Sequence, residues 1–234
     1  MWCKVRIWLE SLLHLFFPQR CAVCGTLLRE GEEAICLHCN IDMPRTGYHL
    51  QEGNPVERLF WGKIPIERAT SYFHYAKGSD FKQILWKFKY KNHRQLALQM
   101  GRLMAAELGN SSFFQEIDVL VPVPLHPHKR RQRGYNQSEL LAKGISEVTG
   151  IPLDTVSLVR RKYTETQTRK SPYERWENVS GIFYLQHPDK LIGKHLLLID
   201  DVLTTASTIT ACADALVDIE GVRISVLTLA VAGD

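Results

Sequence analysis

Two carboxylates followed by a run of hydroxyl side chains form the segment of this sequence best suited to chemistry. Asp200 and Asp201 follow the apolar run 196–199, which is typical of a strand buried in a parallel sheet. After them come Thr204, Thr205, Ser207 and Thr208. Ligands of parallel sheets bind beyond the carboxyl ends of the strands, and the start of a helix, expected here over 207–220, favours a phosphate. The pattern predicts a site for a phosphorylated sugar; two surface acids capping an ordinary helix are the alternative.

The segment 197–208 resembles the phosphoribosyl pyrophosphate (PRPP) signature of type I phosphoribosyltransferases. The resemblance implies that the two acids bind the ribose 2′ and 3′ hydroxyls and that the following loop binds the 5′-phosphate. Ala206 stands where that family usually has glycine. If the position needs a positive φ, the Cβ costs about 1 kcal/mol and could crowd the phosphate. The PRPP-binding residues implied here are Asp200, Asp201, Thr204, Thr205, Ala206, Ser207 and Thr208.

Four of the six cysteines form two pairs, Cys21-x2-Cys24 and Cys36-x2-Cys39. This spacing is typical of a tetrahedral zinc site made of four thiolates. Two disulfides are the alternative, but no cleavable secretory signal is evident and the rest of the chain is typical of a cytosolic enzyme, which favours zinc and a cytoplasmic protein. Four thiolates leave no open position for water, so the predicted zinc site is structural.

The 234 residues, of which 45% are hydrophobic, can form one medium-sized domain with a small appendage, and they exclude a disordered or fibrous protein. The net charge of +4 does not by itself predict nucleic-acid binding. The apolar stretches within 1–17 are too short to span a bilayer, so no transmembrane segment is expected. This segment is predicted to be an amphipathic helix, packed on the protein or a partner, or else lying on a membrane surface.

Basic residues dominate the segment 126–137, which follows the predicted buried strand 118–124 and precedes a helix expected to begin after Asn136. A basic loop at the carboxyl end of a strand suits a highly charged anion such as pyrophosphate, and a nucleic-acid patch is the competing interpretation. Pro122-Val123-Pro124, together with Arg133-Gly134-Tyr135-Asn136-Gln137, resembles the ComF family, a branch of type I phosphoribosyltransferases associated with competence for DNA uptake.

The polar segment 159–183 also resembles this family, in which it corresponds to a flexible lid over PRPP; a surface loop without function is the alternative.

The resemblance covers nearly the whole chain and implies an α/β fold. We expect an N-terminal helix in 1–17, a four-cysteine zinc module in 18–45, a linker in 46–66 and a phosphoribosyltransferase-like domain in 67–234. This domain would have a type I fold, with a mostly parallel twisted sheet flanked by helices. Further strands are predicted over 69–75 and 223–230, and helices over 81–91 and 95–108.

The resemblance also implies a mechanism. PRPP would bind as its Mg²⁺ complex, with Tyr135, Asn136 and Gln137 among its contacts. The positive charges that would stabilise the departing pyrophosphate are those of Arg133, Arg160, Lys162 and Arg175. Nothing in the sequence identifies the acceptor.

Three hypotheses follow. The protein is a PRPP-binding phosphoribosyltransferase that works in DNA uptake, a non-catalytic accessory that binds single-stranded DNA, or a regulator that senses PRPP. The second hypothesis would use the zinc module, the basic loops and the lysines of 82–91; for these lysines a solvated helix face is the alternative. The oligomeric state is not predicted.

Overall fold

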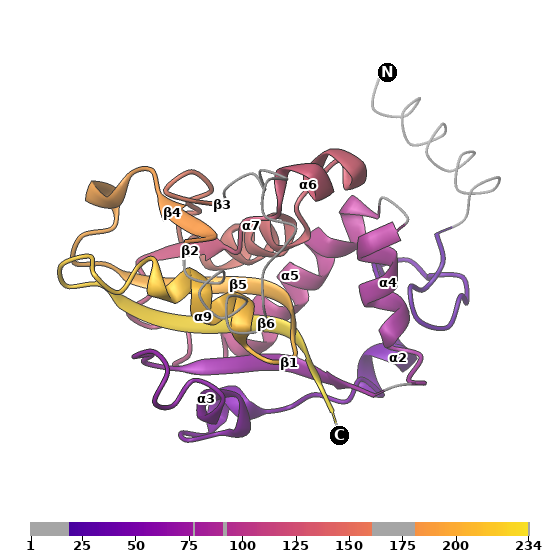
Figure 1. The fold of residues 1–234 in the computed structure, drawn as a ribbon. Helices are drawn as coiled ribbons and strands as arrows, with labels where there is room; N and C mark the ends of the chain where they lie inside the picture. The colour runs from indigo at the N-terminus through magenta and orange to yellow at the C-terminus, as the bar shows by residue number, and fades with distance from the viewer. Residues whose placement is uncertain (1–18, 77, 91–92, 161–180, 234) are drawn as a thin grey trace, which may run out of the picture.

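A computed structural model describes residues 19–76, 78–90, 93–160 and 181–233. Within them, a four-stranded sheet has the order β1 (Ala69–Tyr75), β6 (Arg223–Ala232), β5 (His195–Leu203) and β2 (Val119–Pro122). Every neighbouring pair in this sheet is parallel (Figure 1). The predicted helix 1–17 and most of the predicted lid, including Lys162 and Arg175, lie outside the described residues.

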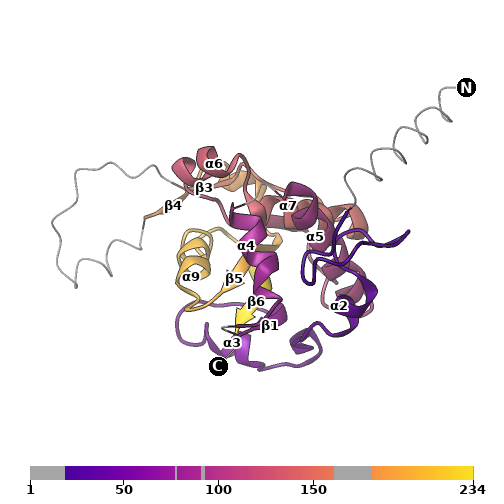
Figure 2. The ribbon, with the colours of Figure 1, turned by 90° about the vertical axis from the view of Figure 1, so that its right-hand side faces the viewer.

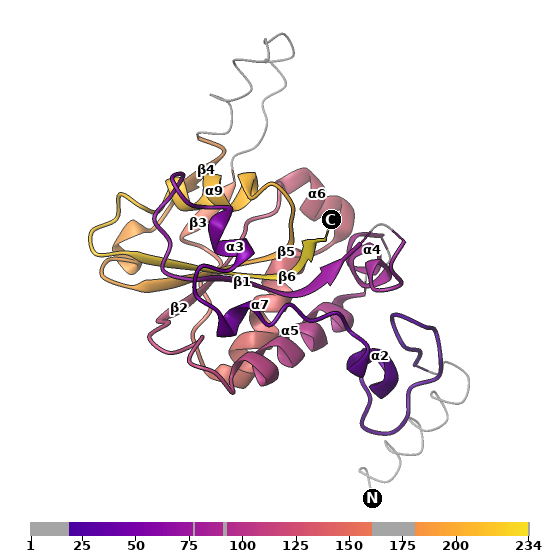
Figure 3. The ribbon, with the colours of Figure 1, turned by 90° about the horizontal axis from the view of Figure 1, so that it is seen from below.

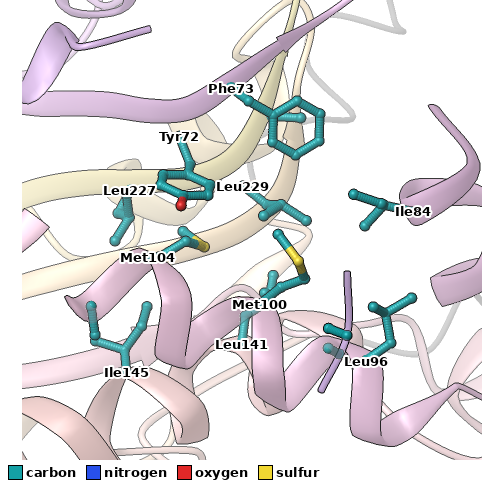
Figure 4. Packing of buried hydrophobic residues seen from close by; sticks show 14 of the residues in the cluster. Tyr72, Phe73, Ile84, Leu96, Met100, Met104, Leu141, Ile145, Leu227 and Leu229 are labelled. Carbon is teal, nitrogen blue, oxygen red and sulfur yellow. The ribbon is translucent and has the colours of Figure 1, made fainter. Parts of the chain in front are cut away.

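The apolar strands lie in the sheet because both of its faces are covered. Helices α5 (Arg94–Leu108) and α7 (Gln137–Thr149) pack on one face, while α3 (Pro55–Arg58) and α9 (Ser207–Asp214) pack on the other (Figure 3). Figure 4 shows the first of these cores, in which Met100 and Met104 lie between the sheet residues Leu227 and Leu229 and Leu141 of α7. The predicted α/β architecture, with a parallel sheet flanked by helices, is confirmed.

The strand 69–75 has the predicted bounds, but β5 is longer than the predicted 196–199. It continues through the two acids because the ladder to β6 continues, pairing Asp200 with Thr228 and Val202 with Ala230. The acids therefore lie inside the end of the strand. The helix predicted over 207–220 ends at Asp214 and is followed by turns.

The basic segment predicted as a loop contains a short helix, α6 (Pro127–Arg133). It forms because Pro127 has the backbone φ that a first helical position needs, and His126 Nδ1 accepts the N–H of His128 at 3.2 Å. Gly134, at φ 77°, ends it. The polypeptide then enters α7, for which Asn136 is the predicted N-cap: its side chain accepts the N–H of Ser138.

Helices α5 and α7 touch backbone to backbone, and two glycines allow it. A Cβ at Gly144 would lie 2.1 Å from the carbonyl oxygen of Leu98, and one at Gly101 would lie 2.2 Å from that of Leu141. Both distances are far shorter than any real contact of a Cβ atom. This close approach fixes the position of α7, whose first turn reaches the end of β5.

The remaining described elements are short. The cysteine-rich segment contains α2 (Leu37–Ile41), and the predicted linker contains η1 (Tyr48–Leu50) and α3. Helix α4 (Lys82–Tyr90) stands at one end of the sheet, and η3 (Pro188–Lys190) precedes β5. Strands β3 (Leu158–Arg160) and β4 (Phe183–Leu185) pair antiparallel where the chain leaves and re-enters the described residues. None of the helices described here is long and apolar enough to cross a membrane.

Candidate functional site

A pocket of about 310 Å³ lies where β5 and β2 end and α7 and α9 begin. Its lining combines two carboxylates with four positively charged side chains, those of Lys89, Lys129, Arg133 and Arg160. The predicted site residues that line it are Arg133, Asn136, Gln137, Arg160, Asp200, Asp201, Thr204 and Thr208. The topology therefore brings the predicted carboxylates, the basic segment and Arg160 of the predicted lid into one place.

The two carboxylates are buried, with 9% of Asp200 and 6% of Asp201 exposed. Asp200 Oδ1 accepts the hydroxyl of Ser138 at 2.9 Å and the N–H of Asp201 at 2.9 Å. Asp201 Oδ2 accepts Nε2 of Gln137 at 3.2 Å and lies 3.6 Å from Nζ of Lys89. Both acids are therefore oriented by side chains from α7 and α4.

Burial and the neighbouring charge of Asp201 raise the pKa of Asp200 to about 7. The hydrogen bonds from the Asp201 N–H and the Ser138 hydroxyl, and the charge of Lys89, act in the opposite direction. The pair thus holds one carboxylate whose charge depends on the pH near neutrality. Such a group is common at functional sites.

Ala206 adopts the left-handed conformation, with φ 62° and ψ −6°, at the start of α9. Position 206 therefore needs a positive φ, the condition under which glycine would be favoured over alanine. Ala206 is the N-cap of α9 and makes no side-chain capping bond. The first turn of this helix consequently offers backbone N–H groups that no N-cap side chain accepts. Thr204 and Thr208 line the pocket beside it, while the hydroxyls of Thr205 and Ser207 lie 2.9 Å apart on the exposed side.

The residues predicted around the start of α7 make different contacts, and one of them lies outside the pocket. Asn136 Nδ2 donates to the carbonyl of Val123 at 3.0 Å, so this side chain joins the end of β2 to α7. Tyr135 is buried outside the pocket lining, and its hydroxyl donates to the carbonyl of Phe88 at 2.6 Å. Arg133 faces the pocket, where Nη1 donates to Oε1 of Gln137 at 3.0 Å.

Arg160 lies at the end of β3, with its guanidinium 5.3 Å from the ring centroid of Phe183 on β4. Its Nε is buried and has no hydrogen-bond partner among the described residues. The β3–β4 pair thus places a cation at the edge of the pocket.

Four polar residues of the lining were not among the predicted site residues: Tyr75, Lys89, Lys129 and Ser138. Ser138 directly follows the Arg133–Gln137 motif, and Lys129 lies in the basic segment, so both had a local signal. Lys89 was considered only as a DNA contact among the lysines of 82–91. Nothing local predicted its place in the pocket, because its contact with Asp201 joins residues far apart in the sequence.

The four predicted metal ligands form a second site. Their ligand atoms lie within 4.8 Å of one another, and Sγ of Cys24 is 3.7 Å from Sγ of Cys36. A tetrahedral site with Zn–S bonds of about 2.3 Å has sulfurs about 3.8 Å apart, whereas a disulfide needs about 2.05 Å. Backbone N–H groups of Val23 and Cys36 donate to Sγ of Cys21 at 3.4 and 3.3 Å, as outer-shell groups of a thiolate site do.

All four cysteines of this cluster are free. Hydrogen bonds to Thr26 lower the pKa of Cys24 to about 6, which favours its thiolate form, whereas burial raises the pKa of the Cys39 thiol. The distances between the sulfurs, rather than the pKa values, favour a metal. The cluster can therefore hold a metal such as zinc, and the alternative of two disulfides does not fit its geometry.

Known proteins with similar sequences support the ComF resemblance. The DNA utilization protein YhgH of Escherichia coli K12 is 29% identical over 199 residues, which cover 84% of this chain and 83% of the relative. Competence protein F of Haemophilus influenzae is 27% identical over 210 residues, 83% of this chain and 89% of the relative. Competence protein ComFC of Bacillus subtilis is 27% identical over 149 residues, 62% and 56% of the two chains. No model of a protein family matches.

Solved structures show a weaker likeness. The PRPP amidotransferase of B. subtilis is 22% identical with a TM-score of 0.39, over 56% of this chain and 25% of that one. The orotate phosphoribosyltransferase of Mycobacterium tuberculosis is 18% identical with a TM-score of 0.35, over 62% and 64% of the two chains.

Proposed function

We propose that this protein binds PRPP with Mg²⁺ in the pocket at the end of β5 and acts as a phosphoribosyltransferase-like protein of DNA uptake. One observation carries the proposal: the buried pair Asp200 and Asp201 is followed, across the left-handed Ala206, by a helix start without a side-chain cap. A pair of buried acceptors beside an anion-binding helix end suits a sugar phosphate. In the same proposal, residues 18–45 form a structural zinc module and 67–234 form the PRPP-binding domain.

The ribose would bind at the carboxylates. Asp200 and Asp201 have oxygens that can accept the 2′ and 3′ hydroxyls, and Ser138, Gln137 and Lys89 hold them in place. Orientation by side chains from other elements is what a pre-organised site requires. In this role the acids fix the ribose and remove no proton from the acceptor.

The 5′-phosphate would bind at the loop 204–208. The N-terminus of α9 supplies N–H groups and a favourable dipole, and the hydroxyls of Thr204 and Thr208 face the same pocket. Thr205, Ala206 and Ser207 would contribute backbone groups of the loop.

The pyrophosphate would lie toward the positive side chains. Lys129, Arg133 and Arg160 line the pocket, and Lys162 and Arg175 are proposed to join them from the lid segment, outside the described residues. As the C1–O bond breaks, positive charge builds on the ribose and negative charge on the departing pyrophosphate, which these cations stabilise. Mg²⁺, chelated by oxygens of PRPP and by water, would neutralise part of the same charge.

The biological setting comes from the relatives. They are named for DNA utilization and competence, and they match over most of their length in the case of YhgH and competence protein F. We therefore place the PRPP site in a protein of DNA uptake, with the acceptor unassigned.

Phosphorus-31 NMR would test where PRPP binds. Titrating the zinc-loaded protein into Mg²⁺–PRPP should shift or broaden the resonances of both the 5′-phosphate and the pyrophosphate. The variant Arg133→Gln should weaken the effect on the pyrophosphate more than that on the 5′-phosphate, and Thr204→Val the reverse. Asp218→Asn, which changes an exposed acid outside the pocket, is the matched control. Unchanged spectra at saturating protein would refute the proposal.

Single-stranded DNA binding is the second candidate function, and helix α6 favours it. Four of its seven residues are Lys129, Arg130, Arg131 and Arg133, and the residues 128–132 are exposed. Such a helix could contact several phosphates, with binding that weakens steeply with salt. Fluorescence anisotropy of a labelled oligothymidylate should then fall in Arg130→Gln/Arg131→Gln, and binding that is independent of salt or of these residues would exclude this surface.

A further inference from the structure

Helix α4 contacts both functional sites. Nζ of Lys87 donates to the carbonyl of Ala22 at 2.7 Å, and Ala22 lies between the first two cysteines of the cluster. Two residues along the same helix, Nζ of Lys89 lies 3.6 Å from Oδ2 of Asp201 in the pocket. Side chains two residues apart on a helix differ in direction by about 200°, so the two lysines point to opposite sides. One lysine therefore reaches the cysteine module while the other reaches the pocket.

Helix α4 is held firmly around these two contacts. Phe88 is fully buried, and its carbonyl accepts the hydroxyl of Tyr135 at 2.6 Å. Ile84 and Leu85 are buried in the same hydrophobic core as Cys21 and Cys36. Figures 1 and 2 show α4 beside the segment that contains α2, at the end of the sheet. A shift of the cysteine module would thus be transmitted to the helix as a whole, because close-packed interiors deform little.

Lys89 has a clear role at the pocket. Asp200 and Asp201 repel each other, and Lys89 is the cation that lies within ion-pair distance of them among the described residues. It offsets the repulsion that would otherwise disfavour two ionised acids at the ribose position. Its side chain is about one-third exposed and is therefore only partly held by its neighbours. The position of its ammonium group consequently depends on where α4 places the backbone of Lys89.

We propose that the cysteine module positions Lys89 through α4, so that metal binding at the module and PRPP binding in the pocket strengthen each other. This inference rests on the proposed function and adds a regulation to it. A protein with metal in its four-cysteine site would hold PRPP more tightly. Coupling between two binding sites is reciprocal, so bound PRPP would raise the affinity for the metal by the same factor and slow the loss of the metal.

The substitution Lys87→Met tests the coupling without touching a cysteine or the pocket lining. It removes the hydrogen bond to Ala22 and keeps an aliphatic chain of similar length. Lys82→Met is the matched control, because it changes the same charge on an exposed position of the same helix. Calorimetric titration of zinc-loaded protein with Mg²⁺–PRPP should give an affinity roughly fivefold lower for Lys87→Met than for Lys82→Met, at the lower end of typical coupling energies. The metal content and melting temperature of each variant identify one that has not folded.

Repeating the comparison in a Lys89→Met background shows whether Lys87 acts through Lys89. If it does, Lys87→Met weakens PRPP binding in the wild-type background and has no effect when Lys89 is absent. A merely structural role of Lys87 would weaken binding equally in both backgrounds, and that result would overturn the inference.

The reciprocal measurement follows transfer of zinc to the chelator 4-(2-pyridylazo)resorcinol, with and without saturating PRPP. PRPP should slow the transfer from the wild type and from Lys82→Met, and not from Lys89→Met. Equal transfer rates with and without PRPP in the wild type would refute the coupling alone, whereas a wild type that binds no PRPP would refute the proposed function as well.

Discussion

The substitution Asp200→Asn tests whether the ionised, buried carboxylate of Asp200 lowers the free energy of unfolding. Burial and the charge of Asp201 raise the pKa of Asp200 from 3.8 to about 7. Because this folded-state pKa lies above the unfolded value, the folded protein holds the proton more tightly than the unfolded chain. The contribution of Asp200 to stability is therefore fully present below pH 3.8 and is lost as the pH rises to about 7.

The magnitude follows from the gap between the two pKa values. Each pH unit between them corresponds to about 1.4 kcal/mol, so ionised Asp200 lowers the free energy of unfolding by about 4 kcal/mol at about pH 8. At about pH 5.5, where the folded group is protonated, the loss is about 2 kcal/mol. Asparagine does not ionise, and its oxygen can still accept the Ser138 hydroxyl. We expect Asp200→Asn to be more stable than the wild type, by a margin that grows by about 2 kcal/mol between these pH values.

Urea unfolding of the zinc-loaded proteins without PRPP, followed by tryptophan fluorescence, measures this margin. Asp201→Asn is the matched control, since it removes the same formal charge but also the partner of Lys89. Asp201→Asn also removes a charge that raises the pKa of Asp200, so we expect a smaller stabilisation from it, because burial still disfavours ionised Asp200 and Lys89 loses its partner. An Asp200→Asn variant that is less stable than the wild type at about pH 8, or whose margin is the same at both pH values, would refute the reasoning.

Three further predictions concern the supports of the two sites. Ser138→Ala removes the hydroxyl bonded to Asp200 and should lower PRPP affinity about tenfold, as loss of a hydrogen bond to a charged group does. Calorimetric titration would measure this loss, and an unchanged affinity would exclude Ser138 as a support of Asp200. Gly144→Ala would place a Cβ 2.1 Å from the carbonyl oxygen of Leu98 and should lower the free energy of unfolding by about 2 kcal/mol or more, measured by urea unfolding. A variant as stable as the wild type would mean that α5 and α7 move apart without cost. Cys36→Ser should reduce bound zinc, measured by atomic absorption, well below one ion per chain, and a full zinc content would contradict the four-thiolate site.

The fold was largely predictable because its strands carry strong local signals. The run 69–75 has the bounds expected, and the apolar run before Asp200 belongs to β5, one of the two inner strands of the sheet. The end of α9 was not predictable, because Leu216 and Ile219 stay buried beyond it and continue the apolar pattern through turns. A hydrophobic pattern reports burial, and it does not report where a helical backbone stops.

The site was predictable where its residues lie next to each other in the sequence. Asp200 and Asp201 are local, and Ala206 was recognised as the position where a positive φ would matter, which its φ of 62° bears out. Lys89 was considered only among the lysines of 82–91 as a DNA contact, and its place in the pocket was outside the reach of such reasoning. It faces Asp201 only because α4 packs at the end of the sheet, and a tertiary contact of this kind leaves no spacing pattern in a single sequence.

The central claim is that two buried carboxylates make this pocket a PRPP site, and calorimetric titration of Mg²⁺–PRPP into the zinc-loaded protein tests it most directly. The wild type and Asp218→Asn should bind PRPP with one site per chain, and Asp200→Asn/Asp201→Asn should bind it at least about tenfold more weakly while remaining folded, because the ribose hydroxyls lose both charged acceptors. Equal binding by the wild type and the double variant, or no binding by either, would contradict the account.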